Sequence, residues 1–328
     1  MKHSSKKHTK STNAAASKVR TKEKGILRNT WDNKALFLMA LPVIVLLILF
    51  HYVPMFGSIV AFKRFNYGDG IWGSPWVGLS NFKFLFSMKS LTWRMLRNTV
   101  GYYLLFTAVG LVFNVALAIA LNECRKKYFA KASQTLMIMP TFISYVAVSY
   151  IVNCFIDPGN GMLNTMLQSL GMNRVAWYNE AKLWPIILTI VNVWKNTGYG
   201  SVVYLSALAG MDQELFEAAQ MDGATKWQQI RRITIPLLMP MVSIMLLMGL
   251  AGIMTSNTGL FYQVTRNSPL LYETTQTIDT YVLNALMSGS TDFGPSSAVS
   301  LFQSVVGCVM CIGVNLIVRK IEPDSALF

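Results

Sequence analysis

The chain has 328 residues, of which 53% are hydrophobic and only 13% are charged. The charged fraction is about half that of an average soluble domain. The apolar residues gather in blocks that approach the roughly 20 residues a helix needs to cross a bilayer. These numbers exclude an ordinary soluble domain, and they predict an all-α, polytopic membrane protein.

The net charge of +14 is unevenly distributed along the chain. Much of the excess lies in residues 1–34, where Lys and Arg alternate with Ser, Thr, Asn and Ala and large apolar side chains are almost absent. This composition predicts a disordered, basic cytoplasmic tail. We expect no nucleic-acid partner, because no aromatic or groove-reading element accompanies the charge.

The apolar residues form six segments, at about 35–60, 98–121, 132–155, 183–209, 235–260 and 296–318. The first is too long for the core of a signal peptide and no cleavage site follows it, so we expect it to remain as a span. An even number of spans places both termini on one side. The basic tail, together with Arg319 and Lys320, indicates that this side is the cytoplasm. Residues 35–320 would then form the membrane domain, and residues 321–328 a short cytoplasmic tail.

One loop contradicts this orientation. Between the first two segments, on the predicted outer side, several basic residues stand against Asp69 alone: Lys63, Arg64, Lys83, Lys89, Arg94 and Arg97. The tail and the basic loop at 125–131 outweigh this loop in the prediction. The outer loops at about 156–182 and 261–295 are polar and rich in turn signals. They could be docking surfaces or plain connectors.

Residues with catalytic or metal-binding chemistry are few. Cys308 and Cys311 share a helix face, but no second pair of Cys or His could complete a four-coordinate site. The three His residues form no set with Ser, Cys or Asp that suggests catalysis. We therefore expect no metal, no cofactor and no enzymatic activity. The phosphate-binding pattern G-x-x-x-x-G-K-[ST] is absent from the sequence, so any ATP hydrolysis would belong to a partner.

Residues 210–232, between the fourth and fifth segments, are too polar for a membrane core and too regular for an ordinary loop. The stretch from Leu215 to Met221 can form an amphipathic helix, and Gly223 permits a turn. A second short helix can follow. Pro236 then stands where a first-turn proline would open the fifth span.

This segment carries a spaced pattern: EAA, three residues, Gly, nine residues, Ile, one residue, Leu, Pro. The chain supplies Glu217, Ala218, Ala219, Gly223, Ile233 and Pro236, with Ile235 in place of Leu, a change that conserves volume. It resembles in this pattern the permease subunits of binding-protein-dependent ABC importers. The resemblance extends over about 35–320. In its general texture it is similar to the carbohydrate-uptake branch, close to permeases for complex oligosaccharides.

The resemblance implies a type I ABC importer permease fold with six transmembrane helices. It also implies that residues 210–232 couple the spans to a separate cytoplasmic ATPase. The expected coupling residues are Glu217, Ala218, Ala219, Asp222, Gly223, Ile233 and Pro236. For Glu217, capping or pairing with an Arg of its own chain is the alternative. The expected partners are a second permease subunit, the ATPase subunits, an extracellular solute-binding protein, and membrane lipid.

Polar residues within the spans are candidates for the solute path, because a charged group at a helix centre costs about 2.5–3.5 kcal/mol on insertion scales. They are Asn192, Lys195 and Asn196 in the fourth segment and Thr255, Ser256 and Asn257 in the fifth. Amides and hydroxyls suit a sugar. Alternatively, the two asparagines bond between helices while Lys195 reaches the interface or pairs with a partner chain. If Lys195 lines the path, it would favour an acidic sugar.

The sequence as a whole predicts a permease subunit of an ATP-driven sugar or oligosaccharide importer in the bacterial cell membrane. Two alternatives remain. The importer could carry a peptide, an amino acid or phosphate, or the chain could be a secondary transporter. The second is disfavoured, because the chain shows no internal repeat and its acidic residues lie in expected loops.

Overall fold

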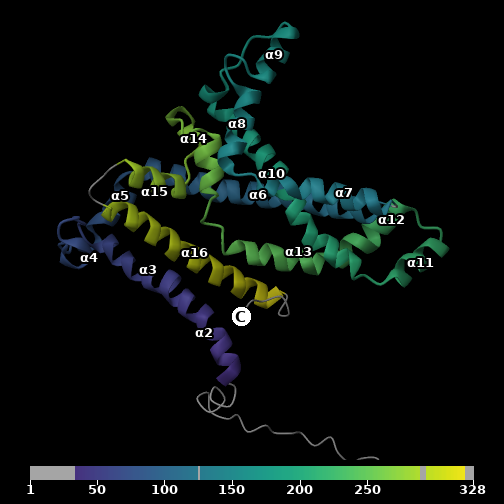
Figure 1. Cartoon of the computed structure of the whole chain (residues 1–328), viewed down its shortest axis with the longest axis horizontal. Helices are drawn as coiled ribbons and strands as arrows, with labels where there is room; N and C mark the ends of the chain where they lie inside the picture. The colour runs from purple at the N-terminus through teal and green to yellow at the C-terminus, as the bar shows by residue number, and fades with distance from the viewer. Residues whose placement is uncertain (1–33, 125, 289–292, 322–328) are drawn as a thin grey trace, which may run out of the picture. The chain divides into compact units, whose positions relative to one another are not determined.

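A computed structural model of the chain describes residues 34–124, 126–288 and 293–321 (Figure 1). Nearly all of the predicted N-terminal tail and of the predicted C-terminal tail lies outside these residues. Within them every regular element is helical, and the one extended pairing is an isolated bridge between Lys63 and Trp76. The predicted all-α class is therefore confirmed. The chain divides into two units, residues 1–57 and 58–328, which are described separately.

The described part of the first unit is one apolar helical stretch. It contains α2 (Lys34–Leu47), a π-turn η1 (Ile48–Tyr52) and α3 (Val53–Met55). The stretch from Leu38 to Phe62 is long and apolar enough to cross a membrane. Pro54 lies in the first turn of α3, where its missing N–H costs least.

The second unit opens with an ordered loop that follows η2 (Phe56–Phe62). Its short elements are α4 (Gly70–Gly73), η3 (Gly78–Phe82) and α5 (Lys83–Ser87). The buried Lys63 Nζ donates to the carbonyl oxygens of Ile71 and Trp72, both at 2.9 Å. Asn81 Nδ2 donates to the carbonyl of Lys63 at 2.9 Å. Backbone carbonyls of the loop therefore satisfy one of the basic residues that complicate the orientation.

Four long helices form the framework of this unit. They are α6 (Lys89–Asn122), α10 (Trp184–Ala209), α13 (Ile235–Leu250) and α16 (Gly294–Ile321). In Figure 1, α6 and α10 lie side by side. A buried cluster of Ala118, Tyr204, Leu208, Leu238 and Val242 joins α6, α10 and α13.

α10 also packs tightly on α7 (Lys127–Ile138) at Gly198. A Cβ at Gly198 would stand 1.8 Å from the carbonyl oxygen of Met137, so no other residue fits at this crossing without moving a backbone.

The third apolar segment is broken, although the sequence predicts one continuous helix at about 132–155. It comprises α7, η4 (Met139–Phe142) and α8 (Tyr145–Ile156), with a bend of 100° at the break. Pro140 lies in η4. After it, Ser144 adopts an extended conformation and its Oγ accepts from Ala147 N at 3.2 Å, which starts a new helix.

The fifth segment also ends earlier than expected. α13 stops at Leu250, a turn follows over residues 251–254, and Thr255, Ser256 and Asn257 have no regular structure. Gly249 and Gly252 flank the end of α13, and both are weak helix formers. The segments predicted to lie on the outer side contain these elements: α9 (Met162–Ser169), η5 (Trp177–Asn179), η6 (Ala181–Leu183), η8 (Gly259–Val264), η9 (Pro269–Leu271), α14 (Tyr272–Thr275) and α15 (Ile278–Met287).

The described residues contain four helices that are long and apolar enough to span a membrane, or five if the bent pair counts as one. α10 is not among them despite its 26 residues. Asn192, Lys195 and Asn196 lower the hydropathy of its middle. The count of six spans therefore stays a prediction.

Candidate functional site

The polar segment between α10 and α13 forms a helix, a turn and a second helix. α11 (Gln213–Met221) begins at Asp212, whose Oδ1 accepts from Glu214 N at 3.0 Å. Gly223 follows with φ +80°, a left-handed conformation that favours glycine. α12 (Lys226–Gln229) begins with a capping box between Thr225 and Gln228. We call residues 212–229 the coupling element.

Beyond α12, the π-turn η7 (Ile230–Thr234) leads into α13, and Pro236 lies in the first turn of that helix, as the sequence predicts.

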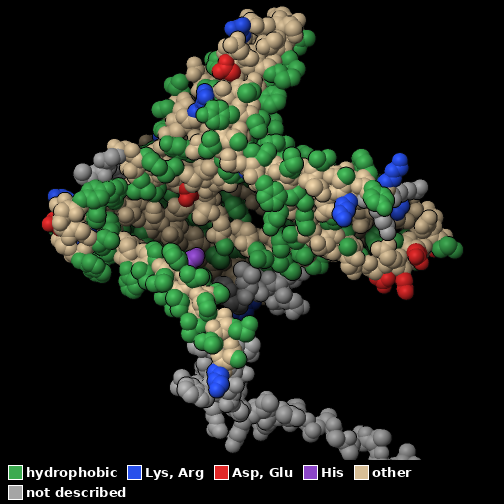
Figure 2. Space-filling view, in the orientation of Figure 1, with side chains coloured by type: hydrophobic (Ala, Val, Ile, Leu, Met, Phe, Trp, Pro, Cys, Tyr) green, Lys and Arg blue, Asp and Glu red, His purple; other side chains and the backbone are tan. Residues whose placement is uncertain are grey.

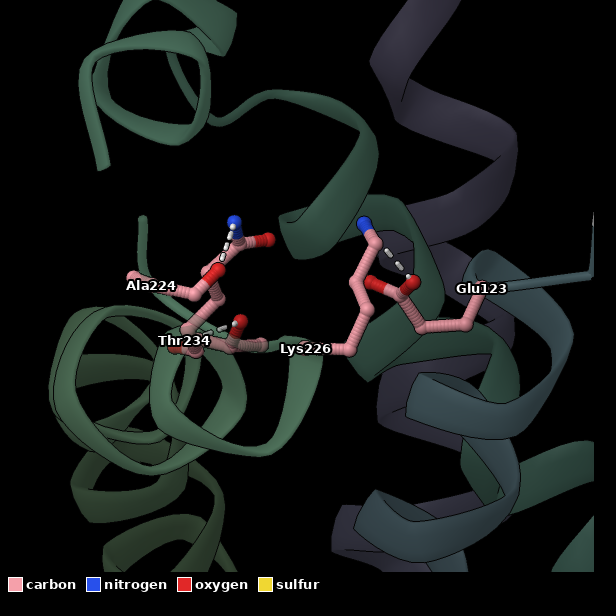
Figure 3. Close-up of polar contacts among 5 residues, drawn as sticks. Glu123, Ala224, Lys226 and Thr234 are labelled. Carbon is pink, nitrogen blue, oxygen red and sulfur yellow. Dashed lines mark hydrogen bonds and ion pairs between the residues drawn. The ribbon is translucent and has the colours of Figure 1, made fainter. Parts of the chain in front are cut away.

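One contact holds the coupling element together, and a second fastens it to the rest of its unit. The buried Gln229 donates from Nε2 to the carbonyl oxygen of Ala224 at 3.3 Å, and this bond ties the end of α12 to the turn before it. Lys226 Nζ lies 3.1 Å from Glu123 Oε2, just beyond the end of α6 (Figure 3). Both charged side chains are partly exposed, so the ion pair orients the element more than it stabilises it.

The outer face of the coupling element exposes large apolar side chains. Met221 is 89% exposed and Trp227 is 70% exposed. Glu217 is exposed on α11, and among the described residues it has no ion-pair partner within 4 Å, so the alternative, a pairing with an Arg of its own chain, is not seen. Figure 2 shows acidic and basic side chains gathered at this end of the unit, whereas hydrophobic side chains cover the helices that lead to it.

The other predicted coupling residues differ in exposure. Ala218, Asp222 and Pro236 are exposed, and Ala219 and Ile233 are half-buried. A Cβ built on Gly223 would meet nothing within 4 Å. Most of these side chains are therefore available to another protein and do little packing within the chain.

A hollow of about 210 Å³ lies between α6 and the break after α13. Hydroxyls, an amide and aromatic rings line it: Thr99, Tyr102, Tyr103, Phe106, Thr107, Thr255, Ser256, Asn257 and Phe261. Tyr102 is only 5% exposed, and its Oη has no hydrogen-bond partner among the described residues. This hydroxyl can therefore hydrogen-bond a group that enters the hollow.

Thr255, Ser256 and Asn257 form the polar wall of the hollow. Two hydrogen-bond networks hold this wall in place. Asn257 Nδ2 donates to Tyr145 Oη at 2.8 Å. Ser256 donates to Asp279 Oδ2 from its backbone N at 2.7 Å and from its Oγ at 2.8 Å. Gln303 Nε2 of α16 donates to Asp279 Oδ1 at 3.1 Å. One carboxylate therefore joins the break after α13 to α15 and α16.

The sequence-based prediction missed Asp279, because its surroundings look like a loop. It lies in the first turn of α15, half-buried and beside the hollow. The sequence does carry a signal for it. Thr277 and Thr280 have the spacing of a capping box at the start of a helix, and Asp279 lies in the first turn, where an acidic residue is favoured.

The predicted pathway residues of α10 lie behind this wall and do not line the hollow. Asn196 Nδ2 donates to Asn192 Oδ1 at 2.8 Å, and both side chains are half-buried. Lys195 is only 4% exposed, and its Nζ donates to three backbone carbonyls.

Within residues 34–124, 126–288 and 293–321, no three His, Cys, Asp or Glu side chains gather in a way that could hold a metal ion. The four cysteines are unpaired thiols.

Comparison with known proteins establishes the class. The family model of the binding-protein-dependent transport system inner membrane component matches residues 110–324, more than half of the chain. The chain belongs to this family. It is a membrane component of a transport system, which confirms the resemblance drawn from the spaced pattern around Gly223.

Particular relatives extend over almost the whole chain. It is 32% identical to Protein LplB of Bacillus subtilis, covering 89% of this chain and 91% of LplB. It is 31% identical to the polygalacturonan/rhamnogalacturonan transport system permease protein YteP of the same organism, covering 93% and 94%. Among solved structures it resembles a bacterial ABC transporter involved in the import of the acidic polysaccharide alginate. The TM-score is 0.80 and the identity 31%, covering 91% of this chain and 100% of that one.

Proposed function

We propose that the chain is one of two membrane-spanning permease subunits of an ATP-driven importer, with both termini in the cytoplasm. The observation that carries this proposal is the coupling element. It exposes the large apolar side chains of Met221 and Trp227 and the carboxylate of Glu217. The space around the turn at Gly223 is open, and the chain belongs to a family of transport-system membrane components. Exposed apolar side chains of this size are typical of a binding surface. A separate cytoplasmic ATPase docks there and drives the transport.

We further propose that the solute is an oligosaccharide. The hollow combines hydroxyls and an amide with aromatic rings, which together can bond sugar hydroxyls and cover ring faces. The buried hydroxyl of Tyr102 supplies an additional donor. Ligand sites usually enclose about 300–1,000 Å³, so a hollow of about 210 Å³ holds only part of such a solute. The second permease subunit completes the path, and an external binding protein delivers the sugar.

The acidic polysaccharides named for the relatives direct the choice of solutes for a test. The importer would be reconstituted in proteoliposomes with its ATPase, second permease subunit and binding protein. Uptake of labelled alginate pentasaccharide and of a rhamnogalacturonan oligosaccharide would be compared with that of maltopentaose. We expect ATP-dependent uptake of at least one saccharide.

Two outcomes would contradict separate parts of the proposal. Uptake of amino acids, peptides or phosphate with no uptake of any saccharide would refute the proposed solute. Uptake that proceeds equally well without the ATPase would refute the coupling.

A further inference from the structure

The break between η4 and α8 creates a local problem for the backbone. The last carbonyls of a helix have no partner within it, and inside a bilayer no water is present to replace one. At the 100° bend the carbonyl oxygen of Pro140 accepts from Ile143 N at 3.2 Å, whereas those of Thr141 and Ile143 have no backbone donor among the described residues. A bend of this kind needs a donor from a neighbouring helix.

Lys195 of α10 provides that donor. Its Nζ lies 3.0 Å from the carbonyl oxygen of Pro140 and 2.9 Å from that of Thr141, and it also donates to Ile143. In return, Thr141 Oγ1 donates to the carbonyl of Lys195 at 2.8 Å. An ammonium group has three donors and no acceptor, so all of its hydrogen bonds are used here. None remains for a solute.

The charge of Lys195 is also balanced locally. Among the described residues, no carboxylate lies within 4 Å of its Nζ. The carbonyl end of a helix carries a partial negative charge, which favours a cation. The ammonium also lies 4.8 Å from the centroid of the Tyr145 ring, a cation–π distance.

The same tyrosine links Lys195 to the hollow. Its ring is confined on another side by Gly259, where a Cβ would stand 2.6 Å from Tyr145 Cδ2. Its Oη accepts from Asn257, which lines the hollow. We propose that Lys195 is a positioning residue, which caps the broken third segment and so holds Tyr145 against Asn257, and that its charge does not face the solute. Only the description of Asn257 as part of the solute path rests on the proposed function.

Thiol labelling tests this inference without any solute. Thr255 is exposed and lines the hollow, so Thr255→Cys would be introduced into full-length protein whose four native cysteines are replaced by Ser. Two methanethiosulfonate reagents would be used, one carrying a sulfonate and one a trimethylammonium group. The readouts are the two labelling rates and their ratio.

We expect Lys195→Met to raise the labelling rates of both reagents by the same factor and so to leave their ratio unchanged. The reason is that Tyr145 and Asn257 would be held less firmly, which makes the cysteine at position 255 more accessible. The increase should be at least roughly threefold, the factor that one average interhelical hydrogen bond in a bilayer represents. Lys195→Arg, which keeps the charge and the donors, should return both rates toward the parent values. Lys182→Met removes an exposed lysine of η6 and measures the effect of lost charge alone.

Two results would overturn the inference. If the ammonium faced the hollow, Lys195→Met would lower the ratio of anionic to cationic labelling by roughly fivefold, as Coulomb attraction at about 8 Å in water implies. Unchanged rates would show that Lys195 positions nothing. If Lys195→Met fails to insert into the membrane, Thr141→Val tests the inference in its place. This variant removes only the bond from Thr141 Oγ1 to the carbonyl of Lys195. It must then raise both rates together, and unchanged rates would again refute the inference.

Discussion

Tyr145 Oη accepts a hydrogen bond from Asn257 Nδ2 at 2.8 Å, although the two residues lie 112 positions apart. The bond joins the start of α8, just after one helix break, to the unwound residues that follow α13. α8 and η8 pack on each other at the same place. Two interrupted segments therefore meet at one tyrosine, and the polar wall of the hollow depends on that meeting.

The Tyr145–Asn257 bond should be measurable as a coupling. Tyr145→Phe and Asn257→Ala are each expected to lower the rate of saccharide uptake by about two- to tenfold, the effect of one net hydrogen bond. The double variant should be little worse than either single variant, because both remove the same contact. Tyr150→Phe, an exposed tyrosine of α8, is the control. Fully additive losses would show that the two residues act independently.

Asp279→Asn should destabilise the protein. The amide would turn donors toward Ser256 or Gln303, and one buried donor would lose its acceptor at a cost of about 1–3 kcal/mol. The measurement is thermal unfolding of the purified protein in detergent. Glu273→Gln changes an exposed carboxylate of α14, which precedes α15 directly, and should have little effect. A parent-like unfolding temperature for Asp279→Asn would show that the carboxylate does not hold the wall.

How much of this could be read from the sequence differs between elements. The coupling element was predictable, because its signals are local: an amphipathic stretch, a glycine at the turn, and Pro236 at the start of the next helix. α10 was predictable from its length and composition. The class followed from the spacing around Gly223.

The two helix breaks, and the charged residues Lys195 and Asp279 that bond to them, could not be predicted from local signals. Pro140 lies at the 100° bend, but Lys195, which donates to its carbonyl there, lies more than 50 residues later. Asp279 looked like a loop residue, because its partners Ser256 and Gln303 lie more than 20 residues away on either side. Hydropathy reads one segment at a time, whereas these contacts exist only after packing.

Gly223→Asn should separate docking from folding. Asn tolerates a left-handed backbone better than other side chains, and space around Gly223 is open, so the variant should insert and unfold like the parent. We expect it to lose ATP-dependent uptake, because the new side chain stands on the docking surface. Gly171→Asn is a matched control, with φ +75° and open space in an outer loop. Equal uptake by the two variants would contradict the docking role.

Trp227→Ala should weaken assembly with the ATPase. A buried tryptophan at the centre of an interface is commonly worth about 2 kcal/mol or more, so the dissociation constant should rise at least about thirtyfold. Binding of the purified ATPase to the permease in nanodiscs gives this constant directly. Trp72→Ala, which removes an equally exposed tryptophan of α4, should leave it unchanged. Identical constants for both variants would place the docking surface elsewhere.

The orientation can be tested at the start of α11. Gln213→Cys is exposed and belongs to the coupling element, so in intact cells it should be protected from an impermeant thiol reagent. Met172→Cys, in the segment after α9, should react from outside. Reaction of Gln213→Cys in intact cells would reverse the proposed topology.

The crossing of α7 and α10 limits how the transporter can move. With the carbonyl of Met137 where a side chain at Gly198 would be, the two backbones are in direct contact, and sliding one past the other would drive main-chain atoms together. We therefore expect α7 and α10 to move as one rigid body. We expect any change of angle during transport to occur at the two places where the helices are interrupted, after Phe142 and after Leu250.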